Sequence, residues 1–190
     1  MHMGTQMQES LIAPAAHLRR FDPRRDLAKV ADLIELCFND TLDRDGRRYV
    51  QSMRNASRVP GIARIASLVE EWSGIPLEGF IWEENGQLVG NLTLIPYRLQ
   101  QRKHYIIANV AVHPAFRRKG IARELTLKGI EYARLKGSPS VWLQVREENT
   151  AAAALYQSLG FQEKARRADW FCRSMFEELA FPEEIKITRR

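Results

Sequence analysis

The sequence contains few cysteines and no long apolar segment. Cys37 and Cys172 are the only cysteines among its 190 residues, which argues against a disulfide framework and favours reduced, structural thiols. No apolar run approaches the roughly 18 residues that a membrane-spanning helix needs, and the first residues, MHMGTQMQES, lack the apolar core of a signal peptide. These absences predict a cytoplasmic protein with no membrane partner.

The charge is basic but is not gathered into one segment. A formal net charge of +6 and a pI near 9.6 suit anionic ligands. The lysines and arginines are spread along the chain and alternate with Asp and Glu, so the sequence shows no nucleic-acid-binding motif. We therefore do not expect a nucleic-acid partner.

The length favours a single domain, because 190 residues suffice for one well-buried core but not comfortably for two. Residues 1–16 show no periodicity and are interpreted as a flexible extension, and residues 177–190 as an uninformative tail. We therefore expect one folded domain over residues 17–176.

Apolar periodicity predicts the order of helices and strands. Helical spacing predicts helices at residues 23–38, 49–53, 65–72, 121–136 and 150–159. Apolar or alternating runs predict strands at residues 80–82, 88–95, 105–112 and 141–145, and then an antiparallel pair within residues 161–175. Asn85-Gly86 between the first two strands predicts a hairpin. This order predicts an α/β fold whose mixed, mostly antiparallel sheet carries helices on both faces.

Three of these elements also carry predictions about burial. The strand at 105–112 is almost continuously apolar, which predicts burial on both faces. Alternation in the strand at 141–145 places Gln144 on the face opposite the apolar residues, in the direction of a cleft. The helix at 121–136 is expected to pack on the sheet through a stripe formed by Ile121, Leu125, Tyr132 and Leu135.

A basic turn separates the strand at 105–112 from the helix at 121–136. Amide groups at a helix N-terminus converge where the helix dipole is positive, and small residues there let a pyrophosphate approach. The spacing [RQ]-x-x-G-x-[GA] alone is a weak pattern that also fits a solvated helix start. The position of this turn after a buried strand favours phosphate binding. The turn lacks the Gly-Lys-Ser/Thr sequence that ends a nucleotide-binding P-loop, which disfavours ATP as the ligand. The candidate binding residues are Arg117, Arg118, Lys119, Gly120, Ile121 and Ala122.

A second motif follows in the helix that Asn149 caps and Gly160 ends. The pattern N-x-x-A-x-x-x-Y-x-x-x-G-F is met in full, with Tyr156 as its phenol. A tyrosine on an amphipathic helix usually fills the core with its hydroxyl at the rim. With an unperturbed pKa of about 10, Tyr156 is protonated at neutral pH and can also donate a proton to a leaving group.

Together the basic turn and this motif resemble the GCN5-related N-acetyltransferase (GNAT) superfamily, most specifically over residues 105–162. The resemblance implies a single-domain GNAT-like fold, acetyl-CoA (coenzyme A) as the cofactor, no metal, and Tyr156 as the general acid that protonates the departing thiolate. It also implies that the pantetheine arm pairs with the backbone of Val110, Ala111 and Val112. The cap residue Asn149 is likewise expected to contact the cofactor.

A finer similarity links WLQVREENTAAAALYQSLGF to the ribosomal-protein N-terminal acetyltransferases, in which a strand glutamate serves as the general base. Gln144 occupies that position here, and an amide cannot accept the proton. Glu147 and Glu148 lie nearby, whereas His104 and His113 are interpreted as surface groups at strand ends. The sequence therefore identifies no base.

The resemblance implies an acetyl-CoA-dependent N-acetyltransferase in which an amine attacks the thioester directly in a ternary complex. An α-amine, with a pKa of about 8, is neutral far more often than a lysine amine near 10.4, so a small-molecule amine or a peptide N-terminus is the expected acceptor. Two alternatives stay open: a protein N-terminal α-amine acetyltransferase, opposed by Gln144, and a non-catalytic acyl-CoA-binding sensor, opposed by Tyr156. A homodimer is compatible with either.

Overall fold

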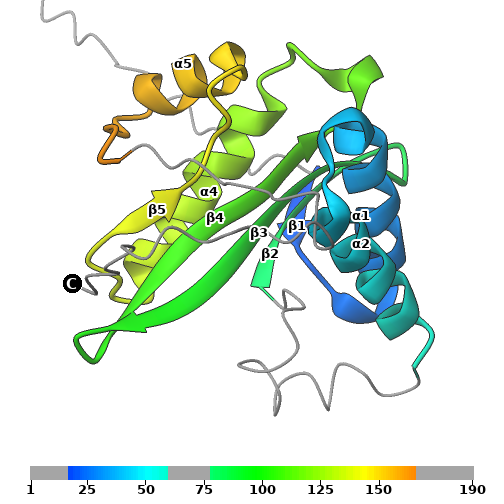
Figure 1. Cartoon of the computed structure of the whole chain (residues 1–190), viewed down its shortest axis with the longest axis horizontal. Helices are drawn as coiled ribbons and strands as arrows, with labels where there is room; N and C mark the ends of the chain where they lie inside the picture. Colours follow the sequence, from blue (N-terminus) through cyan, green and yellow to red (C-terminus); the bar gives the residue numbers. More distant parts are fainter. Residues whose placement is uncertain (1–16, 60–77, 166–190) are drawn as a thin grey trace, which may run out of the picture.

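The computed structural model describes residues 17–59 and 78–165 and contains a five-stranded sheet in the order β1-β2-β3-β4-β5 (Figure 1). Pairing is antiparallel from β1 to β4, and β5 runs parallel to β4. This mixed, mostly antiparallel sheet confirms the predicted fold class. The strands are β1 (Leu18–Arg20), β2 (Glu78–Glu84), β3 (Gln87–Leu99), β4 (Arg102–Val112) and β5 (Val141–Leu143).

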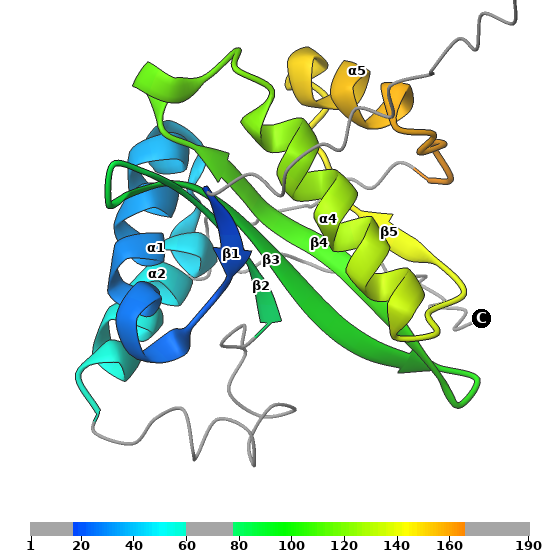
Figure 2. The same ribbon diagram turned by 180° about the vertical axis from the view of Figure 1, so that it is seen from behind.

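Helices cover both faces of the sheet, as predicted: α1 and α2 lie on one face and α4 on the other (Figure 2). Helix α5 follows β5 near the start of α4. Short 3-10 turns, η1 (Asn39–Thr41) and η2 (Pro114–Phe116), follow α1 and β4. The helices are α1 (Pro23–Phe38), α2 (Arg44–Ser57), α4 (Ile121–Leu135) and α5 (Thr150–Ser158).

Local chemistry explains where two of these elements begin. Helix α1 starts after Asp22, whose side chain accepts a hydrogen bond from the amide of Arg24 at 3.0 Å, and Pro23 supplies the first-turn backbone angle. The β2–β3 hairpin turns at Asn85 and Gly86, which have φ of 49° and 79°. Two left-handed residues match the right-handed twist of the flanking strands, which is why Asn-Gly favours such hairpins.

The sheet separates two apolar clusters. The first cluster, beneath α1 and α2, is built from residues such as Leu27, Ile34, Met53 and Ile81. The second, beneath α4, is built from residues such as Leu92, Leu94, Tyr105, Ile107 and Leu125.

Several sequence predictions need correction. In β4, Tyr105 and Ile107 are buried against α4, but Ile106 on the opposite face is only half-buried, because α1 and α2 cover only part of that face. Leu135 is 73% exposed in the last turn of α4, so it does not belong to the packed stripe. Strand β5 ends at Leu143, earlier than expected.

Other predictions fall outside the described residues. The helix at 65–72, the extension at 1–16 and the tail at 177–190 belong to this group, so the domain boundaries stay predictions. Of the antiparallel pair predicted within 161–175, residues 161–165 have no regular structure, and the remainder is not described.

A partly buried cluster of three charged residues joins β1, α1 and β2. Arg19 donates to both carboxylate oxygens of Asp26, at 2.6 and 2.8 Å, and also to Glu83 at 2.6 Å. Asp26 is fully buried. The contact with Arg19 is the main reason why the pKa of Glu83 falls from 4.5 to about 2.

We expect Arg19→Leu to lower the free energy of unfolding by about 3 kcal/mol, because it leaves the Asp26 carboxylate buried without its bidentate partner. Urea denaturation measures this loss. Glu83 adds stability that is present above its ordinary pKa of 4.5 and is lost as pH falls toward 2, so the variant should also lose part of this acid dependence. Arg48→Leu, which removes an exposed pair with Asp45, serves as control and should cost less than about 1 kcal/mol. Equal losses in both variants would contradict this account.

Candidate active site

Strands β4 and β5 pair over three residues and then diverge. Their parallel register joins Tyr105–Ile107 to Val141–Leu143, whereas β4 continues to Val112. Figure 1 shows β4 running on beside the end of α1, while the chain after β5 turns away toward α5. In the described parts of the chain, the β5-facing edge of β4 beyond Ile107 therefore has no strand partner. The predicted pantetheine-binding residues Val110, Ala111 and Val112 lie on this edge.

A bulge lies at the start of this unpaired edge. Thr93 of β3 lies opposite Ala108, but Asn91 lies opposite Ala111, so β4 holds one extra residue. The bulged residue, Asn109, has a left-handed φ of 50°. Its carbonyl accepts a hydrogen bond from Nδ2 of Asn91 at 2.9 Å.

That hydrogen bond fixes the direction of the next amide. The described peptide bonds are all trans, and in a planar trans peptide the N–H points opposite to the C=O. Because the Asn109 carbonyl is directed at the Asn91 side chain, the Val110 N–H points away from that side chain, which favours the unpaired edge of β4. The sequence could not say which amide of this strand faces the opening, and the structure favours Val110.

The carbonyl of Val112 is already engaged. It accepts hydrogen bonds from Nε of Arg117 at 3.1 Å and from the thiol of Cys37 at 3.3 Å. A ligand that pairs with this carbonyl therefore has to displace one of these two donors. Burial raises the pKa of the Cys37 thiol more than Arg117 lowers it, so Cys37 is a protonated, structural thiol, as predicted.

The basic turn leads directly into α4. Arg118 and Gly120 both have left-handed φ, of 65° and 80°, and no side chain caps the helix at Gly120. The first-turn amides of α4 have no partner inside the helix. A Cβ atom added at Gly120 would meet nothing within 4 Å, so the space beside Gly120 at the start of α4 is open.

The side chains of the turn divide into two groups. Those of Arg117, Arg118 and Lys119 are exposed, as an anion-binding role requires. Ile121 is buried at 3% exposure in the cluster beneath α4, so only its backbone amide can serve a ligand. Ala122 is half-buried behind it.

Tyr156 lies on α5, whose cap forms as the sequence predicted. The Asn149 side chain accepts from the amide of Ala152 at 3.1 Å, and Gly160 ends the helix with a φ of 87°. Tyr156 is only 9% exposed and contacts Phe161 edge to face, with ring centroids 5.8 Å apart. Burial raises the pKa of its phenol, which keeps the proton in place at neutral pH.

Beyond the end of β5, Arg146 donates a hydrogen bond to the Thr41 carbonyl in the turn between α1 and α2. Val141 and Leu143 pack toward α4 instead. Exposure alternates from Trp142 through Gln144 to Arg146, but Gln144 lies one residue beyond β5, so its direction toward an acceptor stays a prediction.

The prediction that His104 and His113 are surface groups at strand ends is only partly correct. His104 is buried at 9% exposure, with its Nδ1 2.8 Å from the Ser140 hydroxyl, because β5 and Tyr97 cover it. The ring of His113 accepts from the Ala115 amide at 3.3 Å and caps η2. Glu147 and Glu148 are exposed. No general base for an incoming amine emerges from the described residues.

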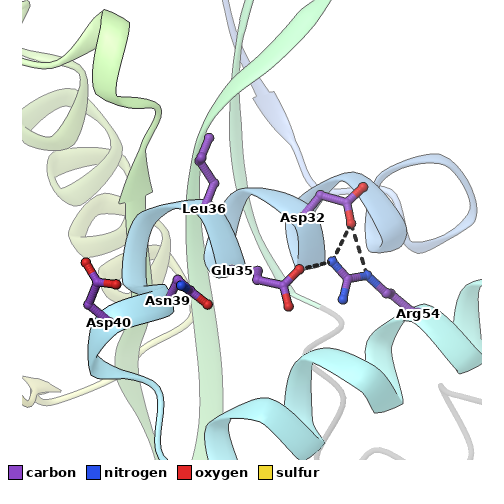
Figure 3. A pocket seen from close by; sticks show the side chains of 6 residues that line it. All are labelled: Asp32, Glu35, Leu36, Asn39, Asp40 and Arg54. Carbon is purple, nitrogen blue, oxygen red and sulfur yellow. Dashed lines mark hydrogen bonds and ion pairs between the residues drawn. The ribbon is translucent and has the colours of Figure 1, made fainter.

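Sequence reasoning missed an acidic hollow between α1 and α2 (Figure 3). Arg54 of α2 donates hydrogen bonds to Asp32 and Glu35 on α1, and this contact lowers the pKa of Glu35. The i, i+3 spacing of the two carboxylates was the available signal. The hollow is lined by Asp32, Glu35, Leu36, Asn39, Asp40 and Arg54.

The described residues contain no helix that is both long and apolar enough to cross a membrane. Within the same ranges, no group of three or more His, Cys, Asp or Glu side chains could hold a metal ion.

Comparison with known proteins identifies the family. The acetyltransferase (GNAT) family profile matches residues 38–161, which include the bulged strand, the basic turn and α5. The chain belongs to the GNAT acetyltransferase family. The resemblance stated from the sequence is thereby confirmed.

Among curated GNAT proteins, the [ribosomal protein bS18]-alanine N-acetyltransferase of Salmonella typhimurium is 43% identical over 63 residues, which are 33% of this chain and 43% of that protein. The finer similarity is confirmed over that stretch, and the chain spans less than half the length of these curated relatives. A mycothiol acetyltransferase from Renibacterium salmoninarum is 52% identical over 52 residues, 27% of this chain and 15% of that protein.

Solved GNAT structures match a larger part of the chain. An aminoglycoside acetyltransferase from an uncultured soil metagenomic sample aligns with a TM-score of 0.57 and 25% identity, covering 82% of this chain and 97% of its own. A putative acetyltransferase from Agrobacterium tumefaciens aligns with a TM-score of 0.57 and 23% identity over 82% and 99% of the two chains. These similarities confirm the fold.

Proposed function

We propose that the protein is an acetyl-CoA-dependent N-acetyltransferase that transfers the acyl group to a primary amine. One observation carries the proposal: the bulged, unpaired edge of β4 leads directly to an uncapped helix N-terminus with open space in front of Gly120. Family membership supports the same activity.

The residues at this site fit coenzyme A. Amides 118–122 and the exposed cations Arg118 and Lys119 would hold the pyrophosphate, because they join a positive helix end to positive side chains. The edge at Val110 and Ala111 would pair with the pantetheine arm, and Asn149 would contact the cofactor beside α5. Acetyl-CoA supplies the acyl group as a thioester.

Two groups of the chain would then assist the transfer. The Val110 N–H would donate to the thioester oxygen, whose negative charge grows as the amine attacks. The nitrogen–carbon bond forms, the carbon–sulfur bond breaks, and Tyr156 would give its proton to the departing thiolate. The attacking nitrogen would lose its own proton to water, and the Tyr156 phenolate would regain a proton from water.

We propose a small-molecule α-amine or a peptide N-terminus as the acceptor. The match to the bS18-alanine N-acetyltransferases favours the peptide, and Gln144 opposes a direct copy of their chemistry. A cytoplasmic location and a homodimer stay predictions.

The proposed function is tested by release of free thiol from acetyl-CoA across a panel of acceptors. The panel holds small primary amines, aminoglycosides, peptides with free N-termini, and the same peptides with blocked N-termini and one lysine. We expect turnover with at least one α-amine. Coenzyme A binding without turnover on any acceptor would favour the sensor alternative, and absence of binding would refute both proposals.

We expect Gln144→Glu to raise the rate on peptide α-amines and to lower the pH at which activity reaches its plateau. The change adds a base of nearly the same shape one residue beyond β5, where we expect the acceptor to bind. Lysine side chains should gain little, because their higher pKa leaves a larger cost of deprotonation. Comparison of pH–rate profiles measures the effect, with Gln87→Glu in the distant β2–β3 hairpin as the matched control. Superimposable profiles for Gln144→Glu and the parent would show that the parent does not lack a base here.

A further inference from the structure

We propose that Asn91 on β3, assisted by Tyr49 on α2, is a positioning residue that aims the Val110 amide at the thioester carbonyl. This inference rests on the proposed function, because it assigns the parts that orient the amide. It concerns three polar side chains around the β4 bulge, which we call the bulge clamp: Asn91, Asn109 and Tyr49.

Asn91 is a polar residue in an apolar place. It is 1% exposed, and its neighbours along β3 include the buried Val89, Leu92 and Leu94. A buried amide is costly unless its hydrogen bonds are made. The Nδ2 group of Asn91 makes its short contact, at 2.9 Å, to the carbonyl of Asn109 and a longer one, at 3.4 Å, to the Thr93 hydroxyl.

Tyr49 holds the side chain of the bulged residue, Asn109. Its hydroxyl accepts a hydrogen bond from Nδ2 of Asn109 at 3.0 Å. Burial raises the pKa of Tyr49 to about 12, so the phenol stays neutral and serves as a hydrogen-bonding group. Asn109 is therefore held through its carbonyl by β3 and through its side chain by α2.

These two contacts hold a backbone conformation that most residues disfavour. A left-handed φ is unfavourable for a residue with a Cβ, although asparagine tolerates it better than most. Because the peptide between Asn109 and Val110 is planar, fixing the carbonyl also fixes the N–H. An oxyanion donor is effective only when it already points to where charge develops. The bulge clamp supplies that orientation from outside the reacting atoms.

The test compares Asn91→Leu with Thr93→Val, a change of a neighbouring buried polar residue that removes only the longer contact of Asn91 and leaves its hydrogen bond to the Asn109 carbonyl. Acetyl-CoA labelled with ¹³C at the acetyl carbonyl is bound to each protein, and the carbonyl stretching frequency is measured by infrared difference spectroscopy. We expect the parent and Thr93→Val to lower this frequency relative to free acetyl-CoA. Asn91→Leu should lose most of that shift. The measurement needs no acceptor.

Kinetics on one acceptor give a second readout. We expect kcat to fall about tenfold or more in Asn91→Leu, while the KM for acetyl-CoA stays within about threefold, because the basic turn is untouched. Tyr49→Phe keeps the ring and removes the oxygen that accepts from Asn109, so it should also lower kcat and leave the KM nearly unchanged. If Asn91→Leu does not fold, Tyr49→Phe tests the bulge clamp in its place.

The outcomes separate the two proposals. A parent protein that does not bind acetyl-CoA overturns the proposed function itself. A parent that shifts the carbonyl band, together with folded Asn91→Leu and Tyr49→Phe proteins that keep both the shift and kcat, overturns the bulge clamp alone.

Discussion

Gly120→Glu is expected to abolish coenzyme A binding without unfolding the protein. The new side chain would enter the open space beside Gly120 at the start of α4, and its carboxylate would repel the pyrophosphate from the proposed site. Stabilisation by the ligand, which should be a few kcal/mol for the parent at about 100-fold excess over Kd, should vanish with it.

Isothermal titration with coenzyme A and thermal melting with and without the ligand measure this effect. Gly137→Glu is a close control, because Gly137 also has a left-handed φ, of 73°, with nothing within 4 Å of an added Cβ, at the other end of α4. Both variants carry the same backbone strain and charge. Equal coenzyme A affinity in Gly120→Glu and Gly137→Glu would contradict the phosphate site.

Tyr156→Phe is expected to reduce turnover about 100-fold or more while acetyl-CoA still binds. The change keeps the ring that contacts Phe161 and removes only the hydroxyl that would protonate the thiolate. Burial raises the pKa of this phenol, so the parent has the proton available across the neutral range.

Single-turnover rates are the appropriate measurement, because slow product release can hide a slower chemical step. Tyr105→Phe is the control: it removes another buried phenol, at the half of β4 that pairs with β5. An unchanged rate in Tyr156→Phe would make Tyr156 a packing residue.

Local signals allowed most of the fold to be predicted. Asp22-Pro23 starts α1 and Asn85-Gly86 makes the hairpin, because both act through backbone geometry within a few residues. The basic turn could be located for the same reason, since a glycine and a helix start are adjacent in sequence. Leu135 was misassigned because helical spacing alone does not show where the sheet beneath a helix ends.

Long-range contacts explain what could not be predicted. The left-handed Asn109 depends on Asn91, 18 residues away, and on Tyr49, 60 residues away. The early end of β5 depends on where β4 diverges, which no local pattern records. The sequence therefore pointed to the cofactor strand but not to the amide within it that faces the opening.

The most direct test of the account is titration of ¹⁵N-labelled protein with coenzyme A, followed through the backbone amide signals. The central claim is that the cofactor lies along the unpaired edge of β4 and on the first turn of α4. We predict that the largest shifts occur at amides 110–112 and 118–122, while those lining the acidic hollow of α1 and α2 stay nearly constant. Saturable shifts confined to other amides, or none at millimolar ligand, would contradict it.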